Sequence, residues 1–112
     1  MTNIHFYKES GRFVGFSSQG HSSFDEEGRD IVCAAISAVT IMTANAAEGV
    51  LKYHKHIHQN KKKNRIFIIW EQGGEKWEVL LEAYHLFLIN FKKQYPHNIQ
   101  IKYLNIGGVS ND

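Results

Sequence analysis

The sequence predicts a single α+β domain in which strands and helices follow the order ββαβαβ, with two helices packed on a four-stranded sheet. At 112 residues and 43% hydrophobic, the chain is long enough for one core and too short for two. Residues 30–51 and 75–95 are too long for strands, whereas four shorter runs are rich in β-branched and aromatic residues. No Pro/Ser-rich linker divides the chain, so we predict one domain over residues 1–112.

The four short runs differ in pattern. Residues 2–8 and 12–18 predict a β-hairpin with a glycine in its turn. Residues 65–70 are nearly all apolar, as expected of a central strand, and residues 98–104 alternate as in a half-exposed strand. The polar and basic residues 52–64 are expected to form a connection or a frayed helix end.

The two long stretches predict different helices. Residues 30–51 are apolar around most of a helical circumference, so we expect this helix to be buried, capped by Asp30 and loosened or ended near Gly49. Residues 75–95 are amphipathic, with glutamates in the first turn, lysines in the last and Pro96 beyond. The apolar stripe of this second helix is predicted to contain Trp77, Leu80, Leu81, Tyr84, Leu88, Phe91 and Tyr95.

Composition limits the classes of function. A net charge of +2 is too weak by itself to indicate a nucleic-acid partner, and one cysteine excludes an internal disulfide or a CxxC motif. We find no signal peptide and no uninterrupted apolar span of about 18 residues, so we expect a soluble, cytoplasmic protein. The tail from about residue 107 is predicted to be disordered.

The only cysteine, Cys33, stands at the start of the first helix. If Asp30 is the N-cap, unpaired N–H groups and the helix dipole near Cys33 favour the nucleophilic thiolate, although the Asp30 carboxylate opposes it. His21, in the Gly/Ser-rich and acidic residues 19–28 that we expect to be mobile, is a candidate general base. Ser37, one turn further on, could bond within a site or to the Cys33 carbonyl. The common alternative is a buried cysteine that only fills space.

Two further motifs carry less weight. His54 and His58 have the i, i+4 spacing of a metal pair if they are helical, but no third ligand is evident and solvated histidines are the better interpretation. The basic run at residues 60–65 is more typical of a solvated surface than of an RNA contact. We therefore predict no metal and no organic cofactor.

The stretch from Gly20 to Ser37 resembles the ribosomal-processing cysteine protease (Prp) family. The "GH" pair, a short loop and "GRDIVCAAIS" match that family without a gap, and Asn45 also fits. Length and element order are similar too, although residues 52–112 match only in pattern. The matching positions are Gly20, His21, Gly28, Asp30, Ile31, Val32, Cys33, Ala34, Ala35 and Ser37.

The resemblance implies a function. Members of this family are small bacterial cysteine endopeptidases that remove an N-terminal extension from large-subunit ribosomal protein twenty-seven, cutting after a pair of aromatic residues. The family's catalytic pair falls on Cys33 and His21, and its conserved aspartate and serine fall on Asp30 and Ser37. The loop that closes over the peptide corresponds to Gly20, Ser22, Ser23, Phe24 and Gly28.

One departure and one alternative stay open. Asp25, Glu26 and Glu27 make the loop more acidic than the resemblance implies, which could favour a basic residue in the peptide. A non-catalytic, ribosome-associated module that holds a peptide or RNA is the alternative, although binding alone does not need a cysteine–histidine pair. The sequence also leaves open a homodimer, and it indicates no membrane partner.

Overall fold

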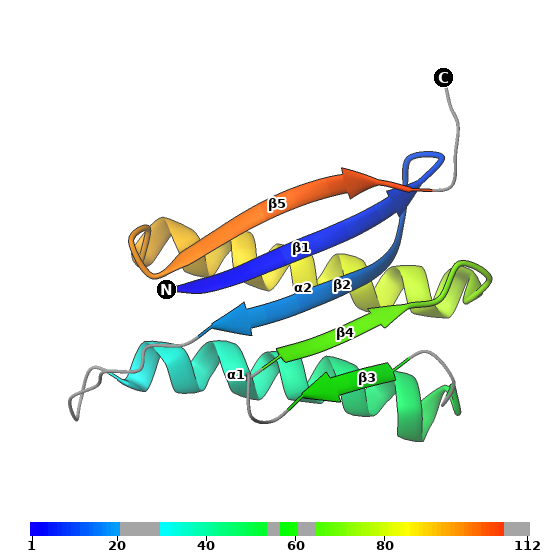
Figure 1. Ribbon diagram of the computed structural model, residues 1–112, viewed down its shortest axis with the longest axis horizontal. Coiled ribbons are helices and arrows are strands. Elements are labelled where there is room, and N and C mark those ends of the chain that lie inside the picture. The colour runs from blue at the N-terminus through cyan, green and yellow to red at the C-terminus, as the bar shows by residue number, and fades with distance from the viewer. Residues whose placement is uncertain (21–29, 54–56, 61–64, 107–112) are drawn as a thin grey trace.

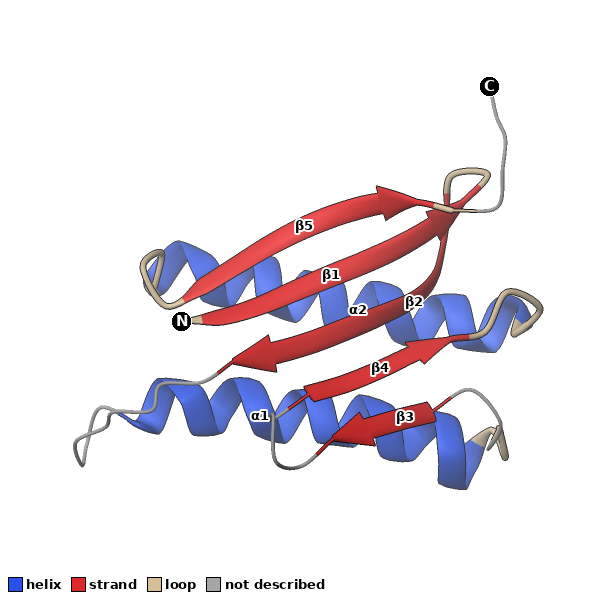
Figure 2. Ribbon diagram, viewed as in Figure 1, coloured by secondary structure: helices blue, strands red, loops and turns tan. Residues whose placement is uncertain are grey.

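The computed structural model describes residues 1–20, 30–53, 57–60 and 65–106, with the backbone alone for residues 30 and 57–60. Both predicted helices and all four predicted strands are present, which confirms the α+β class (Figure 1, Figure 2). The predicted disordered tail lies outside the described residues. The elements are β1 (Thr2–Glu9), β2 (Arg12–Gly20), α1 (Asp30–Asn45), the π-helical turn η1 (Ala46–Val50), β3 (Ile57–Asn60), β4 (Arg65–Ile69), α2 (Gly74–Gln94) and β5 (Ile99–Asn105).

The sheet has one strand more than predicted. Five described strands lie in the order β3-β4-β2-β1-β5, and β5 runs parallel to β1. The additional strand, β3, lies inside the stretch that was expected to be a connection or helix end, and it pairs antiparallel with β4. The sequence of β3, IHQN, has only one apolar residue, as is common for an edge strand. This sequence therefore gives almost no indication of a strand. His58 lies in this strand, so the helical His54–His58 spacing does not exist.

Helix α1 departs from its prediction at both ends. Asp30 is the first residue of the helix rather than the cap before it. At the other end the helix continues as η1, where the Leu51 N–H donates to the Ala46 carbonyl, 2.9 Å away. This i to i+5 bond is the π-helical pattern. The expected loosening near Gly49 therefore takes the form of a wider helical turn.

Helix α1 is less buried than its sequence suggests. Its fully buried residues are Ile36, Thr40 and Thr43, whereas Ile31 and Met42 are 70% and 60% exposed. The expectation of a helix buried around most of its circumference was wrong, because a two-layer fold covers one side of the helix only.

Residues Ile31–Val50 also form the one described helix that is long and apolar enough to cross a membrane, contrary to our expectation of no such span. The core helix of a soluble protein meets the same criterion of length and composition, and here one side of the helix lies in the core.

Both helices pack against the same face of the sheet. They are joined inside the core where the Tyr84 hydroxyl of α2 lies 2.7 Å from Thr40 Oγ1 of α1, which itself donates to the Ile36 carbonyl. Burial raises the pKa of Tyr84, so its hydroxyl stays protonated and can donate to Thr40. The core cluster consists of Ile4, Phe6, Phe16, Ile36, Ala47, Ile68, Trp77, Leu81, Tyr84, Leu88 and Ile99.

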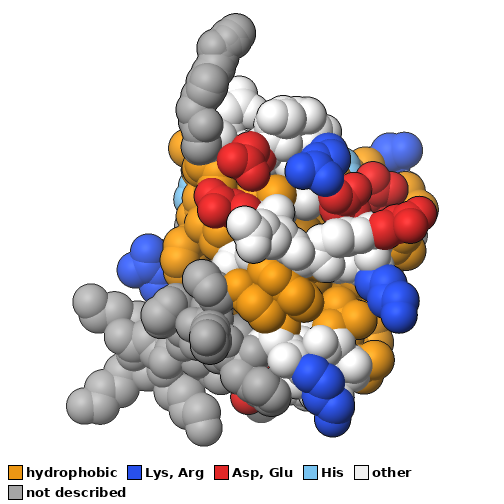
Figure 3. Space-filling model, turned by 90° about the vertical axis from the view of Figure 1, so that its right-hand side faces the viewer, with side chains coloured by type: hydrophobic (Ala, Val, Ile, Leu, Met, Phe, Trp, Pro, Cys, Tyr) orange, Lys and Arg blue, Asp and Glu red, His pale blue; other side chains and the backbone are white. Residues whose placement is uncertain are grey.

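An aromatic stack packs the segment after η1 against the residue that follows β4. The Tyr53 and Trp70 rings are parallel, with centroids 3.4 Å apart, and Trp70 also contacts Trp77. Trp77 lies in the core as predicted, while Trp70 is half-buried against it. Figure 3 looks at this end of the molecule, where β4 leads into α2, and shows hydrophobic side chains at the surface among charged ones.

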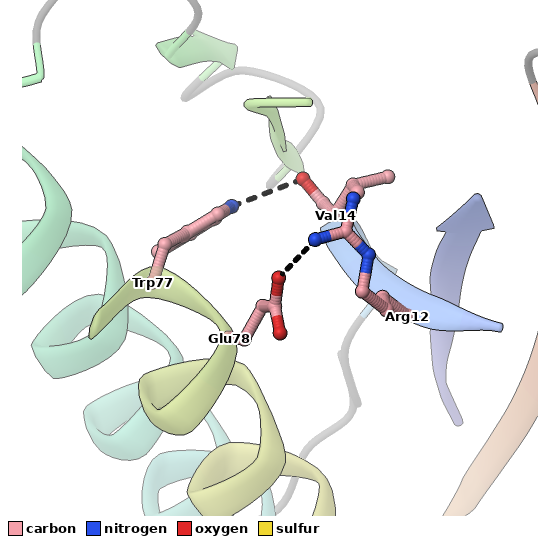
Figure 4. A network of polar contacts seen from close by, with 4 residues as sticks. All are labelled: Arg12, Val14, Trp77 and Glu78. Atoms are coloured by element: carbon pink, nitrogen blue, oxygen red, sulfur yellow. Dashed lines mark hydrogen bonds and ion pairs between the residues drawn. The ribbon is translucent and has the colours of Figure 1, made fainter. Parts of the chain in front are cut away.

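Two polar contacts attach the start of α2 to β2 (Figure 4). The buried Trp77 indole N–H donates to the Val14 carbonyl at 3.0 Å. One residue further on, Glu78 accepts a hydrogen bond from the Arg12 guanidinium at 2.8 Å. The ion pair is partly exposed and contributes little, about 0–1 kcal/mol, so the buried indole is the main attachment.

No described helix covers the opposite face of the sheet, which faces the viewer in Figure 1. The register across β5, β1, β2 and β4 arranges the side chains of this open face in three rows, because paired residues point the same way. The rows are Gln100–Asn3–Gln19–Arg65, Lys102–His5–Ser17–Phe67 and Leu104–Tyr7–Gly15–Ile69.

His85 forms a smaller cluster between α2 and the sheet. Its ring contacts Phe6 edge-on and Phe13 at a tilt, both with centroids 5.0 Å away, and its Nε2 is hydrogen-bonded to the Tyr103 hydroxyl. Burial, assisted by the nearby Lys8 ammonium, lowers the pKa of His85, although Glu82 partly opposes the shift. The folded protein therefore favours the neutral imidazole.

This cluster predicts a loss of stability in weak acid. Because the pKa of His85 is lower in the folded than in the unfolded state, its contribution is present above about pH 6.5 and lost as the pH falls below that value. Urea unfolding at about pH 7.5 and pH 5.5 should show this fall in the free energy of unfolding. His85→Phe keeps an aromatic ring in place and should show a smaller fall; an equal fall in both proteins would assign it to other groups.

Candidate active site

Cys33 lies in the first turn of α1, as its fourth residue. It is a free thiol, half-buried, and so is neither a core side chain nor fully exposed. The core at this level is formed by Ile36, which is 1% exposed, and Val32 packs against it. Cys33 is therefore not needed as core filler, and a peptide carbonyl could approach its sulfur.

The start of α1 lies at the same end of the molecule as the end of β2, which precedes His21 in the chain (Figure 1). The intervening residues 21–29 lie outside the described residues, and with them His21, Ser22, Ser23, Phe24 and Gly28. The described part of the predicted site thus consists of Gly20, the Asp30 backbone, Cys33 and Ser37.

Two of the candidate site residues flank Cys33 in α1. Asp30 precedes Cys33 by three residues and Ser37 follows it by four, so each position is about one helical turn away from Cys33. Ser37 is exposed, which leaves its hydroxyl accessible to a ligand. The back-bond that was one alternative for Ser37 occurs in this helix at Thr40 and Thr43, whose hydroxyls donate to the Ile36 and Val39 carbonyls.

The structure shows why residue 20 is a glycine, which the sequence did not reveal. The φ of Gly20 is 104°, in the region that side-chain-bearing residues rarely adopt, and a Cβ there would lie 2.6 Å from the Met1 carbonyl oxygen. Gly20 pairs with Thr2 at the end of β2. A glycine is thus required where the chain leaves the sheet, directly before His21.

Gly20→Ala is expected to impair catalysis beyond its effect on stability. The substitution should cost about 1–2 kcal/mol in backbone strain and should displace the chain directly before His21. A displacement of about 1 Å can slow an enzyme about a hundredfold. Peptide cleavage and thermal unfolding measured on the same samples check this. A wild-type cleavage rate in Gly20→Ala would mean that Gly20 does not position His21.

Asp30→Asn is expected to accelerate alkylation of Cys33 below neutral pH, because it removes a negative charge from the position one helical turn before Cys33. Its effect on stability should be small, because Asp30 begins the helix and loses only a favourable interaction of about 0.3–1 kcal/mol with the helix dipole. The measurement is the alkylation rate against pH for both proteins. An unchanged or slower rate in the variant would show that the carboxylate does not face Cys33.

The described residues hold no group of three or more histidine, cysteine, aspartate or glutamate side chains that could bind a metal ion.

Comparison with known proteins identifies the family. The family model described as "Cysteine protease Prp" matches residues 1–100. The chain belongs to the Prp family of cysteine proteases. The ribosomal processing cysteine protease Prp of Staphylococcus aureus is 25% identical over 96 residues, which cover 85% of this chain and 91% of that relative.

Solved structures share the Prp fold. The Staphylococcus aureus ribosomal processing protease Prp, crystallised with a covalently linked product peptide, superimposes with a TM-score of 0.80 at 24% identity. The superposition covers 92% of this chain and 99% of that one. A Streptococcus mutans protein superimposes with a TM-score of 0.79, also at 24% identity, over 95% of this chain and 96% of its own. The α+β fold of this Prp chain thus agrees with solved structures.

Proposed function

We propose that this protein is a cysteine endopeptidase in which Cys33 is the nucleophile and His21 the general base. The observation that carries the proposal is the place of Cys33, half-buried in the first turn of α1, at the same end of the molecule as the end of β2, which precedes His21. Membership in a cysteine protease family requires a nucleophilic cysteine, and Cys33 is the only one in the chain.

In this mechanism the Cys33 sulfur attacks the carbonyl carbon of the scissile peptide bond and its proton passes to His21. N–H groups of Ile31 and Val32, in the first turn, lack partners within the helix and are suited to bind the developing oxyanion. His21 then protonates the leaving amine. Water attacks the thioester with His21 again as base, which releases the acid product and restores the thiol.

We further propose that the substrate is the N-terminal extension of large-subunit ribosomal protein twenty-seven, cut after a pair of aromatic residues in the cytoplasm. The support is the resemblance of Gly20–Ser37 to the family and the ribosomal processing named for the Staphylococcus aureus relative. The acidic Asp25, Glu26 and Glu27 favour a peptide that carries a basic residue near the cut. Association with the ribosome would follow from this substrate.

The test is cleavage of a synthetic peptide that spans the N-terminus of this ribosomal protein from the source organism. Mass spectrometry should find a single cut after the aromatic pair, and a peptide with both aromatic residues changed to alanine should stay intact. Binding of the peptide without cleavage would instead support the non-catalytic module. Cleavage elsewhere would retain the protease and remove the proposed substrate.

We also propose that two copies associate through the exposed side of α1. Ile31, Ile41 and Met42 are 70%, 46% and 60% exposed, and no charged residue occurs between Ile31 and Ala47. The exposed Ala34 and Ala38 on the same side would let two helices approach closely. A second copy presents the same uncharged surface, so the two surfaces are complementary without any charge pair.

This dimer is testable by sedimentation. The wild type should sediment as a dimer, and Met42→Glu should give a monomer because it places a charge in the apolar contact. Leu86→Glu is the matched control, since Leu86 is 61% exposed on α2, away from the proposed contact, and should stay dimeric. A monomeric wild type at micromolar concentration would overturn the dimer.

A further inference from the structure

Charge is unevenly divided between the sheet and the rest of the chain. The five strands contain four lysine or arginine residues, Lys8, Arg12, Arg65 and Lys102, and a single acid, Glu9. The chain has 11 acids in all, so the other ten lie outside the strands. No acid occurs in the three rows of the open face, where Arg65 and Lys102 are both exposed. This face is suited to a polyanion.

The two cations stand at opposite sides of the open face. Lys102 lies on the edge strand β5 and Arg65 on β4, with β1 and β2 between them. At the usual strand spacing this separates them by about 14 Å across the sheet. His5 lies between them, opposite Lys102 on β1. An extended anion with charges spaced along a chain could contact both cations, whereas a single small anion could not.

Tyr7 provides an aromatic surface beside these cations, on the strand next to β5 and one row beyond Lys102. Its hydroxyl is 3.2 Å from Ser17 Oγ on β2, although Tyr7 itself pairs with Gly15. The side chain therefore extends from β1 towards Ser17 on β2, and its paired residue Gly15 has no side chain of its own. At Gly15 a Cβ would clash with the Ile68 carbonyl oxygen, so a side chain cannot fill that space.

Phe67 completes the aromatic surface. Its ring is perpendicular to that of Tyr7, at 84°, with centroids 5.6 Å apart, and both residues are half-buried. Two perpendicular rings side by side can receive a planar group by stacking on the face of one ring and contacting the other.

We propose that this open face binds single-stranded nucleic acid, with a base on Tyr7 and phosphates at Lys102 and Arg65. Aromatic side chains between basic residues are the means by which proteins bind unpaired strands without strong sequence preference. A duplex has no unstacked base to offer Tyr7. A second copy of this chain fits poorly, because an isologous contact through this face would bring its cations together. The residues of this surface differ from those of the proposed protease site.

The experiment is fluorescence anisotropy with a labelled oligouridine or oligothymidine of about 12 nucleotides, within the usual site sizes. The wild type should bind at low salt. Lys102→Gln should reduce the slope of log affinity against log salt by about 0.7, as expected for one lost phosphate contact. Lys93→Gln, which removes an exposed charge from α2 instead, should leave the slope unchanged.

Tyr7 is tested by two variants. Tyr7→Leu should weaken binding about tenfold through the loss of stacking, while Tyr7→Phe keeps the ring and should bind like the wild type. Equal losses in both variants, or equal slopes for Lys102→Gln and Lys93→Gln, would overturn the proposal, as would absence of binding at low salt. Equal competition by duplex DNA or polyglutamate would show a site for any polyanion, which also overturns it. Peptide cleavage by Lys102→Gln should remain at the wild-type rate, so this result stands apart from the protease proposal.

Discussion

Cys33→Ala is expected to abolish peptide cleavage and to leave the fold intact. Removal of the sulfur removes the atom that forms the covalent intermediate, so the rate should fall by about a thousandfold or more. The loss of stability should be small, because Cys33 is only half-buried and the core below it is formed by Ile36. Cleavage kinetics and urea unfolding of the same preparation measure both effects.

The partner of Cys33 can be identified by combining variants. His21→Ala should cause a loss of similar size, and the double variant should be no slower than either single one, because a nucleophile and its base act as a unit. Ser37→Ala is the matched control on the same side of α1, and it should retain most of the activity if Ser37 only supports the site. Cleavage by Cys33→Ala at the wild-type rate would refute the mechanism.

Trp77→Ala is expected to destabilise the fold more than any of the substitutions at the candidate site. Trp77 is 1% exposed, and its indole N–H donates to the Val14 carbonyl, so the variant leaves a cavity and a buried carbonyl without this donor. Together these should lower the free energy of unfolding by about 3–5 kcal/mol. A corresponding fall of about 15 °C in Tm would be expected for a domain of this size.

A neighbouring residue provides the control. Val79 lies on the same helix but is 60% exposed, so Val79→Ala should change the free energy of unfolding by less than about 0.5 kcal/mol. Thermal unfolding of both variants measures the difference. If Trp77→Ala lost less than about 1 kcal/mol, the start of α2 would not depend on the Trp77 attachment to β2.

Prediction from the sequence succeeded where one local pattern determined the result. The stripe of α2 repeats at helical spacing, and the predicted Trp77, Leu81, Tyr84 and Leu88 are all buried. It failed for α1, because an uncharged helical sequence is compatible both with a helix covered on all sides and with one that exposes an apolar side. It also missed β3, whose polar sequence becomes a strand only through pairing with β4.

At the candidate site, too, some features could be predicted from the sequence and others could not. The place of Cys33 in the first helical turn could be predicted, because it depends only on where the helix starts. The requirement for glycine at residue 20 could not, since it arises from contact with the Met1 carbonyl, which directly precedes the neighbouring strand β1. The rows of the open face were equally inaccessible, because they depend on the pairing of β1 with β5.

That pairing also determines when the molecule can finish folding. Ile4 of β1 lies opposite Ile101 of β5, so β1 cannot complete its pairing before β5 has been synthesised. Until β5 leaves the ribosome, one side of β1 exposes unpaired N–H and C=O groups, which is the usual template for aggregation. Closure of the sheet is thus a late, long-range step that follows synthesis of β5. A chain that stops before Ile99 would lack it altogether, so such fragments should be recovered as aggregates rather than as folded domains.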